Sequence, residues 1–94
     1  MLKNKKLAVL GCGKLGETLI KGLLEAGVIE VANVIVTAGH PHRLEQLRER
    51  FGVAGALSNQ IAAESADLII LAVKPQTVPH VLSEISDTLR PSQV

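Results

Sequence analysis

Short apolar runs alternate with amphipathic stretches along this chain. The apolar runs are four, each short enough for a buried strand, at residues 7–10, 34–36, 53–56 and 68–73. The stretches that follow them space their apolar residues as helices do, at residues 14–26, 41–51, 58–64 and 78–89. Regular alternation of strand and helix predicts an α/β domain, a parallel sheet flanked by helices with strand order 3-2-1-4.

The helix boundaries and faces can be predicted in more detail. Gly27 is expected to end the first helix and Gly52 the second, while Pro41 suits a first helical turn. Either Ser58 or Asn59 can cap the third helix. The expected buried face of the first helix consists of its large aliphatic residues, which are Leu15, Leu19, Ile20, Leu23 and Leu24.

Composition narrows the function classes. Hydrophobic residues make up 47% of the chain and Phe51 is its only aromatic residue, so the core must be aliphatic, as in buried parallel strands. A net charge of +1 without Trp or Tyr argues against nucleic-acid binding. Cys12 is the single cysteine, so an internal disulfide is excluded and a metal site is not expected. A chain with one cysteine is typical of the reducing cytoplasm. The apolar run at residues 7–10 is too short for a secretion signal or a membrane span, so we expect no membrane partner.

The end of the chain carries a further expectation. Val94 lies about where another strand would begin, so the strand at residues 68–73 would lie at an uncovered edge. Complete proteins usually cover such an apolar edge, because it promotes association. We therefore expect residues 1–94 to be an incomplete domain of a longer protein, and the isolated chain to self-associate.

A glycine-rich loop follows the first predicted strand and opens the first predicted helix. Residues 11–16 have the spacing G-x-G-x-x-G, which is typical of Rossmann-like dinucleotide-binding domains in this context. Gly11 would permit the tight turn, Gly13 would let the backbone approach a pyrophosphate, and Gly16 would let helix and strand pack closely. The helix start would bind the phosphates through its free N–H groups. The alternative is that the glycines merely turn the chain.

Two other loop residues have open roles. Lys14 can add charge near the phosphates or point to solvent on the polar helix face. Cys12 fits better as a small loop residue than as a reactive thiol, because Lys14 is the one basic group near it in sequence.

The turn after the second strand favours NADP over NAD. NAD-binding domains place an acid at the end of this strand for the ribose hydroxyls, but no acid lies between Glu30 and Glu45. Thr37 and Arg43, with the start of the second helix, would instead attract a 2′-phosphate. For His40 and His42 a phosphate contact and a solvated turn, with His40 as a poor cap, are equally supported.

Several segments together resemble the N-terminal domain of pyrroline-5-carboxylate reductases. They are residues 11–16, the turn at residues 37–43, Asn59, and the run at residues 66–76 that contains Ala72-Val73-Lys74-Pro75. The last run is the most specific, because a buried strand leaving through Ala-Val-Lys-Pro is similar to that family's fourth strand. The resemblance covers nearly all of this chain and about a third of such an enzyme. One departure is Gly39, where the family often has arginine.

The resemblance implies a reductase that transfers hydride from NADPH, or from NADH, to the imine carbon of 1-pyrroline-5-carboxylate, giving L-proline in proline biosynthesis. It implies that Asn59 and residues 72–75 line the cofactor site. It also implies a helical C-terminal domain that supplies substrate contacts and dimerisation, and hence a homo-oligomer.

The physical interpretation of residues 72–75 agrees. Ligands bind beyond the carboxyl ends of parallel strands, so Lys74 would project into that crevice and Pro75 would fix the exit direction. Without the resemblance, a proline-stopped strand with a surface lysine is equally consistent. Nothing in the chain looks like a nucleophile–base pair, so we predict no catalytic residue and assign the hydride chemistry to the cofactor.

Other functions share these features. One alternative is another NADP-linked enzyme, such as a prephenate, 3-hydroxyacid or deazaflavin-linked dehydrogenase. A second, from another class, is a non-catalytic regulatory module that binds the dinucleotide without turnover.

Overall fold

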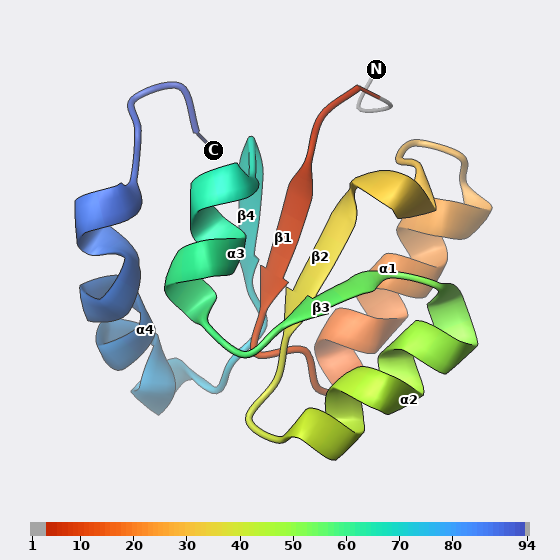
Figure 1. Ribbon diagram of the computed structural model, residues 1–94, viewed down its shortest axis with the longest axis horizontal. Coiled ribbons are helices and arrows are strands. Elements are labelled where there is room, and N and C mark those ends of the chain that lie inside the picture. The colour runs from red at the N-terminus through yellow and green to blue at the C-terminus, as the bar shows by residue number, and fades with distance from the viewer. Residues whose placement is uncertain (1–3, 94) are drawn as a thin grey trace.

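The four predicted strands pair into one parallel sheet in the order β3-β2-β1-β4, as expected (Figure 1). The computed structural model describes residues 4–93. In the sheet, Ala8 lies opposite Ile35 on one side and Ile69 on the other. The strands are β1 (Leu7–Leu10), β2 (Val34–Thr37), β3 (Ala54–Ala56) and β4 (Leu68–Leu71).

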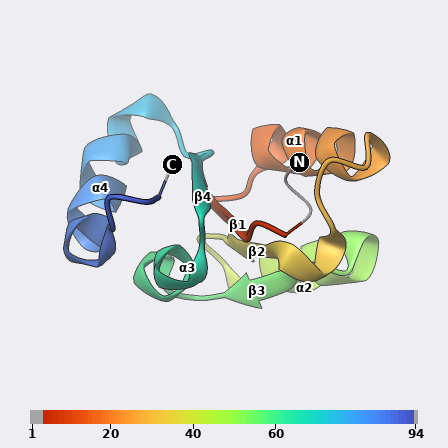
Figure 2. The same cartoon turned by 90° about the horizontal axis from the view of Figure 1, so that it is seen from above.

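Helices cover both faces of the sheet, one pair on each side (Figure 2). The alternation of side chains along β1 divides the core between them. Leu7 and Val9 pack with α1 (Lys14–Glu25) and α2 (Pro41–Phe51), whereas Ala8 and Leu10 pack with α3 (Asn59–Ser65) and α4 (Val78–Ile85). Short 3₁₀ turns complete the chain at η1 (Val31–Asn33), η2 (Pro75–Thr77) and η3 (Ser86–Thr88).

Local chemistry sets the helix ends. Pro41 begins α2, and Gly52, in the left-handed conformation at φ 75°, ends it. The His40 ring caps α2 by accepting the N–H of His42 at 3.2 Å, which is the capping position that the solvated-turn interpretation gave it. Of the two candidates for α3, Ser58 is the cap: its hydroxyl accepts the N–H of Ile61.

The predicted buried face of α1 is wrong in part. Gly16 and Ile20 are buried, whereas Leu15 is 64% exposed and Leu19 39%. Gly16 brings the helix backbone close to β1, which turns the face centred on Gly16 and Ile20 toward the sheet and rotates Leu15 and Leu19 away from it.

Two predicted ends are also corrected. β4 ends at Leu71 rather than at Val73, although the N–H of Ala72 still donates to the carbonyl of Leu10. α4 ends at Ile85 and continues as the turn η3, so Leu89 lies outside the helix and is half exposed. Within residues 4–93, no helix has the length and apolar content required to cross a membrane.

Candidate functional site

The carboxyl ends of β1, β2 and β4 meet at one edge of the sheet, and a cleft of about 500 Å³ opens there. This edge contains the switch point of the sheet, since the chain leaves β1 toward one face and β4 toward the other (Figure 1). Residues from three loops line the cleft: Gly11, Cys12, Gly13, Ala38, Gly39, His40, Arg43, Ala72, Val73, Lys74 and Thr77.

The three loop glycines differ in what surrounds them. Gly11 has φ +71°, and a Cβ there would overlap the side chain of Val73. A Cβ on Gly16 would lie 3.0 Å from Cys12 Sγ and 3.1 Å from Ala72 Cβ. These contacts confirm the predicted turn at Gly11 and the predicted close packing at Gly16. At Gly13 no heavy atom of residues 4–93 lies within 4 Å of the added Cβ, so the backbone there is open to the cleft.

Thr37 holds the glycine loop from β2. Its carbonyl accepts the N–H of Cys12 at 2.7 Å, and its hydroxyl accepts the N–H of Gly11 at 2.9 Å. The same hydroxyl donates to Asn59 Oδ1, and Asn59 Nδ2 donates to Glu84 Oε1 at 3.1 Å. Thr37 is 2% exposed. The Thr37 hydroxyl is therefore buried and bonded within the fold, and its contact with a 2′-phosphate stays a prediction.

The exit from β4 forms the wall opposite the turn after β2. Ala72 and Val73 are half-buried, and Val73 fills the space above Gly11. Lys74 is exposed on the rim of the cleft, where the sequence placed it. Pro75 then begins η2 and turns the chain toward α4.

Some predicted site residues lie away from the cleft. Leu15 is exposed on α1, and Lys14 lines a separate shallow hollow with Thr18, Lys21 and Arg50. Of its two open roles, Lys14 therefore has the solvent-facing one. Asn59 lines a smaller adjoining cavity of about 300 Å³ that also reaches Gly11 and Thr37.

The turn after β2 carries the charged groups. His40 and His42 are exposed, and the N–H of Arg43 donates to the His40 carbonyl at 3.0 Å. The Arg43 guanidinium lines the cleft, and its Nε donates to the carbonyl of Cys12 at 3.4 Å. Arg43 therefore reaches from α2 across to the glycine loop.

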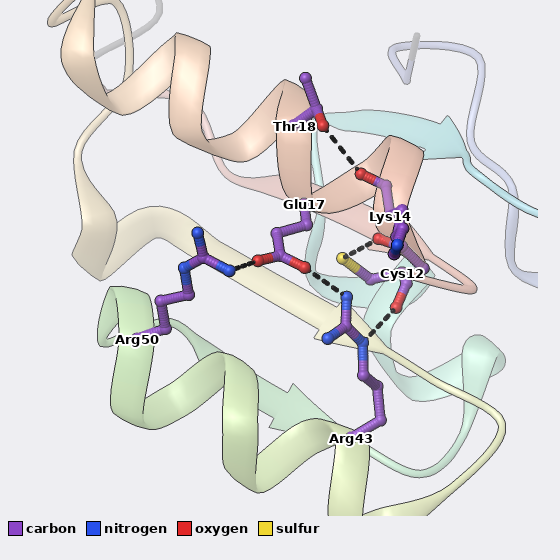
Figure 3. Close-up of polar contacts among 7 residues, drawn as sticks. Cys12, Lys14, Glu17, Thr18, Arg43 and Arg50 are labelled. Atoms are coloured by element: carbon purple, nitrogen blue, oxygen red, sulfur yellow. Dashed lines mark hydrogen bonds and ion pairs between the residues drawn. The ribbon is translucent and has the colours of Figure 1, made fainter.

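Glu17 is the main partner of Arg43 (Figure 3). Arg43 Nη2 lies 2.6 Å from Glu17 Oε2, and Arg50 Nη1 pairs with Glu17 Oε1. The hydrogen bond from Arg43 holds the pKa of the Glu17 carboxyl below its ordinary value of 4.5; burial opposes this, and the charge of Arg50 adds to it. One acid of α1 thus links both ends of α2.

Cys12 is a packing residue in this structure. Its thiol is buried under Gly16, and burial raises its pKa, although the positive charge of Arg43 acts in the opposite direction. A thiol in that state is a poor nucleophile, which agrees with the interpretation of Cys12 as a small loop residue.

Known proteins are similar to this chain in sequence and in fold. Residues 6–94 match the family model described as NADP oxidoreductase, coenzyme F420-dependent. The chain belongs to this family. Coenzyme F420 is a deazaflavin, so this family includes the deazaflavin-linked enzymes that are one of the alternatives above.

The individual relatives of this chain have a more specific name than the family has. The chain is 36% identical over 92 residues to pyrroline-5-carboxylate reductase 1 of Bacillus subtilis, which covers 97% of this chain and 31% of that protein. It is 41% identical over 83 residues to the pyrroline-5-carboxylate reductase of Corynebacterium melassecola, covering 88% and 30%. The crystal structure of the Plasmodium falciparum pyrroline carboxylate reductase with NADP bound matches with a TM-score of 0.82 and 27% identity, over 98% of this chain and 32% of that one. The chain therefore spans about a third of the length of these relatives.

Sequence reasoning missed several residues of the site. Ala38, Gly39 and Thr77 line the cleft, and their position just beyond β2 and β4 was the signal that could have found them. Glu17 had no such signal, because its two partners lie 26 and 33 residues away.

Proposed function

We propose that this chain binds NADP(H) across the carboxyl ends of β1, β2 and β4, as the dinucleotide-binding part of a reductase that converts 1-pyrroline-5-carboxylate into L-proline. The observation that carries the proposal is the bare backbone at Gly13. Of the three loop glycines, only Gly13 has room for a Cβ among the described residues. Val73 occupies the space beside Gly11, and Cys12 and Ala72 occupy the space beside Gly16. A pyrophosphate needs such a space beside a helix start.

The residues around that space fit a dinucleotide. The first amides of α1 have no partner within the helix and would donate to the phosphates. Ala72 and Val73 offer an apolar wall, and Lys74 offers a positive charge at the rim. When bound, the dinucleotide would supply the hydride for the imine carbon. The role of this chain is to bind and orient it against the substrate.

The charge of the cleft supports NADP rather than NAD. No carboxylate is among the residues that line the cleft in residues 4–93, whereas Arg43 is. Position 39 is glycine, so Arg43 from the first turn of α2 is the arginine available to a 2′-phosphate. A hydrogen bond to such a charged group is worth about 1.5–3 kcal/mol, or roughly 10- to 150-fold in affinity. Thr37 would act indirectly by holding the loop.

The choice of substrate is supported by the relatives, because proteins named pyrroline-5-carboxylate reductase match most of the chain at 30–41% identity. The family description alone would also suit a deazaflavin-linked enzyme. We include in the proposal a cytoplasmic homo-oligomer with a small imine as substrate.

Dinucleotide selectivity can be tested on this chain by titration calorimetry with NADP⁺ and NAD⁺. We expect tighter binding of NADP⁺, by roughly 10-fold or more, and loss of that preference in Arg43→Ala. Arg48→Ala, an exposed arginine on the same helix, is the matched control and should keep the preference. Equal affinity for both dinucleotides, insensitive to Arg43→Ala, would contradict the assignment.

The reaction is tested in a protein that carries this domain together with the remaining length of its relatives. Adding 1-pyrroline-5-carboxylate should cause loss of NADPH absorbance and formation of proline. Binding of NADPH without any turnover would instead support the regulatory module.

A further inference from the structure

The Glu17 carboxylate is shared between two arginines of α2 that differ in their surroundings (Figure 3). The Arg43 side chain is 29% exposed and lines the dinucleotide cleft, whereas that of Arg50 is 61% exposed and lies away from it. The Glu17 side chain itself is 13% exposed. The cluster of Glu17, Arg43 and Arg50 therefore connects the cleft to the far end of α2.

The charges of the cluster leave Arg43 able to change partners. Two guanidinium groups face one carboxylate, and each binds a different oxygen of Glu17. If Arg43 turns away, Glu17 still has Arg50 and is not left as an unpaired charge. A phosphate monoester carries more charge than a carboxylate and is a strong partner for arginine.

We propose that Glu17 is a specificity-determining residue, which holds Arg43 in the absence of a 2′-phosphate and competes with that phosphate for Arg43. Arg50 has the opposite effect, because it neutralises Glu17 and so weakens its hold on Arg43. The preference for NADP over NAD is thus set by three residues, one of which is an acid on the glycine-loop helix. This inference rests on the proposed binding of a dinucleotide.

The proposal makes opposite predictions for the two partners of the cluster. Removing the charge of Glu17 frees Arg43, so Glu17→Gln should raise the ratio of NADP⁺ affinity to NAD⁺ affinity by about 3- to 10-fold. NAD⁺ has no phosphate at this position, so its affinity should stay within about twofold. Without Arg50, Arg43 is the one remaining partner of Glu17 among the described residues, and Glu17 holds it more strongly. Arg50→Gln should therefore lower the ratio of NADP⁺ affinity to NAD⁺ affinity by about 2- to 5-fold.

The experiment is titration calorimetry of the chain with NADP⁺ and NAD⁺ for both variants and for the double variant. Arg50 acts through Glu17, so Arg50→Gln should have no effect on the ratio in the Glu17→Gln background. Arg48→Gln removes the same charge from an exposed position on α2 and is the control for long-range electrostatics.

The outcomes separate this inference from the proposed function. If neither dinucleotide binds the wild-type chain, the proposed function fails. If both bind but Glu17→Gln leaves the ratio unchanged or lowers it, the proposed function stands and the role of Glu17 is overturned. Equal effects of Arg50→Gln and Arg48→Gln would overturn the role of Arg50.

Discussion

The cleft has two ends, the glycine loop and the turn after β2, and different interactions fix their geometry. At the glycine loop the geometry is set by backbone and packing: Gly11 adopts a left-handed conformation beneath Val73, and Gly16 packs on Cys12 and Ala72. At the turn after β2 the geometry is set by charged side chains, with Arg43 held by Glu17.

This difference predicts how each end responds to change. Close packing of backbone against side chain leaves no room at Gly11 and Gly16, so an added methyl group at either position must cost free energy. An ion pair that is partly exposed, as Arg43 is, can exchange partners at a smaller cost than a packed backbone can move. The loop end would thus determine whether a dinucleotide binds at all, and the charged end would tune which one.

The largest effect is expected at the turn itself. Gly11→Ala would place an L-residue at φ +71° and drive its Cβ into Val73, so the free energy of unfolding should fall by about 3 kcal/mol. Gly27→Ala is the matched control, because Gly27 has φ +70° and its added Cβ would meet no atom of the described residues within 4 Å. It should cost about 1 kcal/mol. Equal losses in urea denaturation would show that the contact with Val73 is unimportant.

A smaller effect is expected where β2 holds the loop. Thr37→Val keeps the shape of the side chain but leaves the N–H of Gly11 without its acceptor, which should cost about 1–3 kcal/mol of unfolding free energy. Thr18→Val removes an exposed hydroxyl that donates to the Lys14 carbonyl, and should change stability by no more than about 0.5 kcal/mol. Thermal or urea denaturation of the pair measures both. Similar values for the two threonines would contradict the role given to Thr37.

The smallest effect is expected at the charged end. The pKa of Glu17 is lowered in the folded protein, so its ionisation stabilises the fold above its ordinary pKa of 4.5. That stabilisation should be lost as the pH falls through the lowered pKa. Urea denaturation between about pH 3 and pH 7 should show a shallower loss of stability on acidification in Glu17→Gln than in the wild type. Parallel curves would mean that the ion pairs with Arg43 and Arg50 do not affect folding.

The same contrast explains what could be predicted from the sequence. The bounds of α2 were predicted correctly because Pro41 and Gly52 fix both ends by covalent and conformational limits. The parallel sheet followed from alternation and handedness, and the strand order followed from the doubly wound type of dinucleotide-binding fold. The roles of Gly11 and Gly16 followed from their spacing after a strand, because close packing there leaves few other choices.

What failed depended on contacts between distant segments. The spacing of leucines predicted Leu15 and Leu19 as buried, but the face of α1 that meets the sheet is chosen by where Gly16 allows close approach. The hydrogen bonds of the Thr37 hydroxyl to the glycine loop and to Asn59 could not be predicted either, because these partners lie 26 and 22 residues away. Glu17 was one of several charges on a polar helix face, and nothing local distinguishes it from the others.

The most direct test of the central claim is the affinity for NADP⁺ of Gly13→Val compared with Gly22→Val. Within the part of the chain that the structure describes, neither glycine has an atom within 4 Å of an added Cβ, but Gly13 opens to the cleft and Gly22 lies exposed on α1. Valine at Gly13 would occupy the space of the pyrophosphate, so titration calorimetry should show at least about a 10-fold loss of affinity, while unfolding free energy falls by only about 1 kcal/mol. Gly22→Val should bind as the wild type does. Unchanged binding by a folded Gly13→Val variant would contradict the claim that this loop holds the dinucleotide.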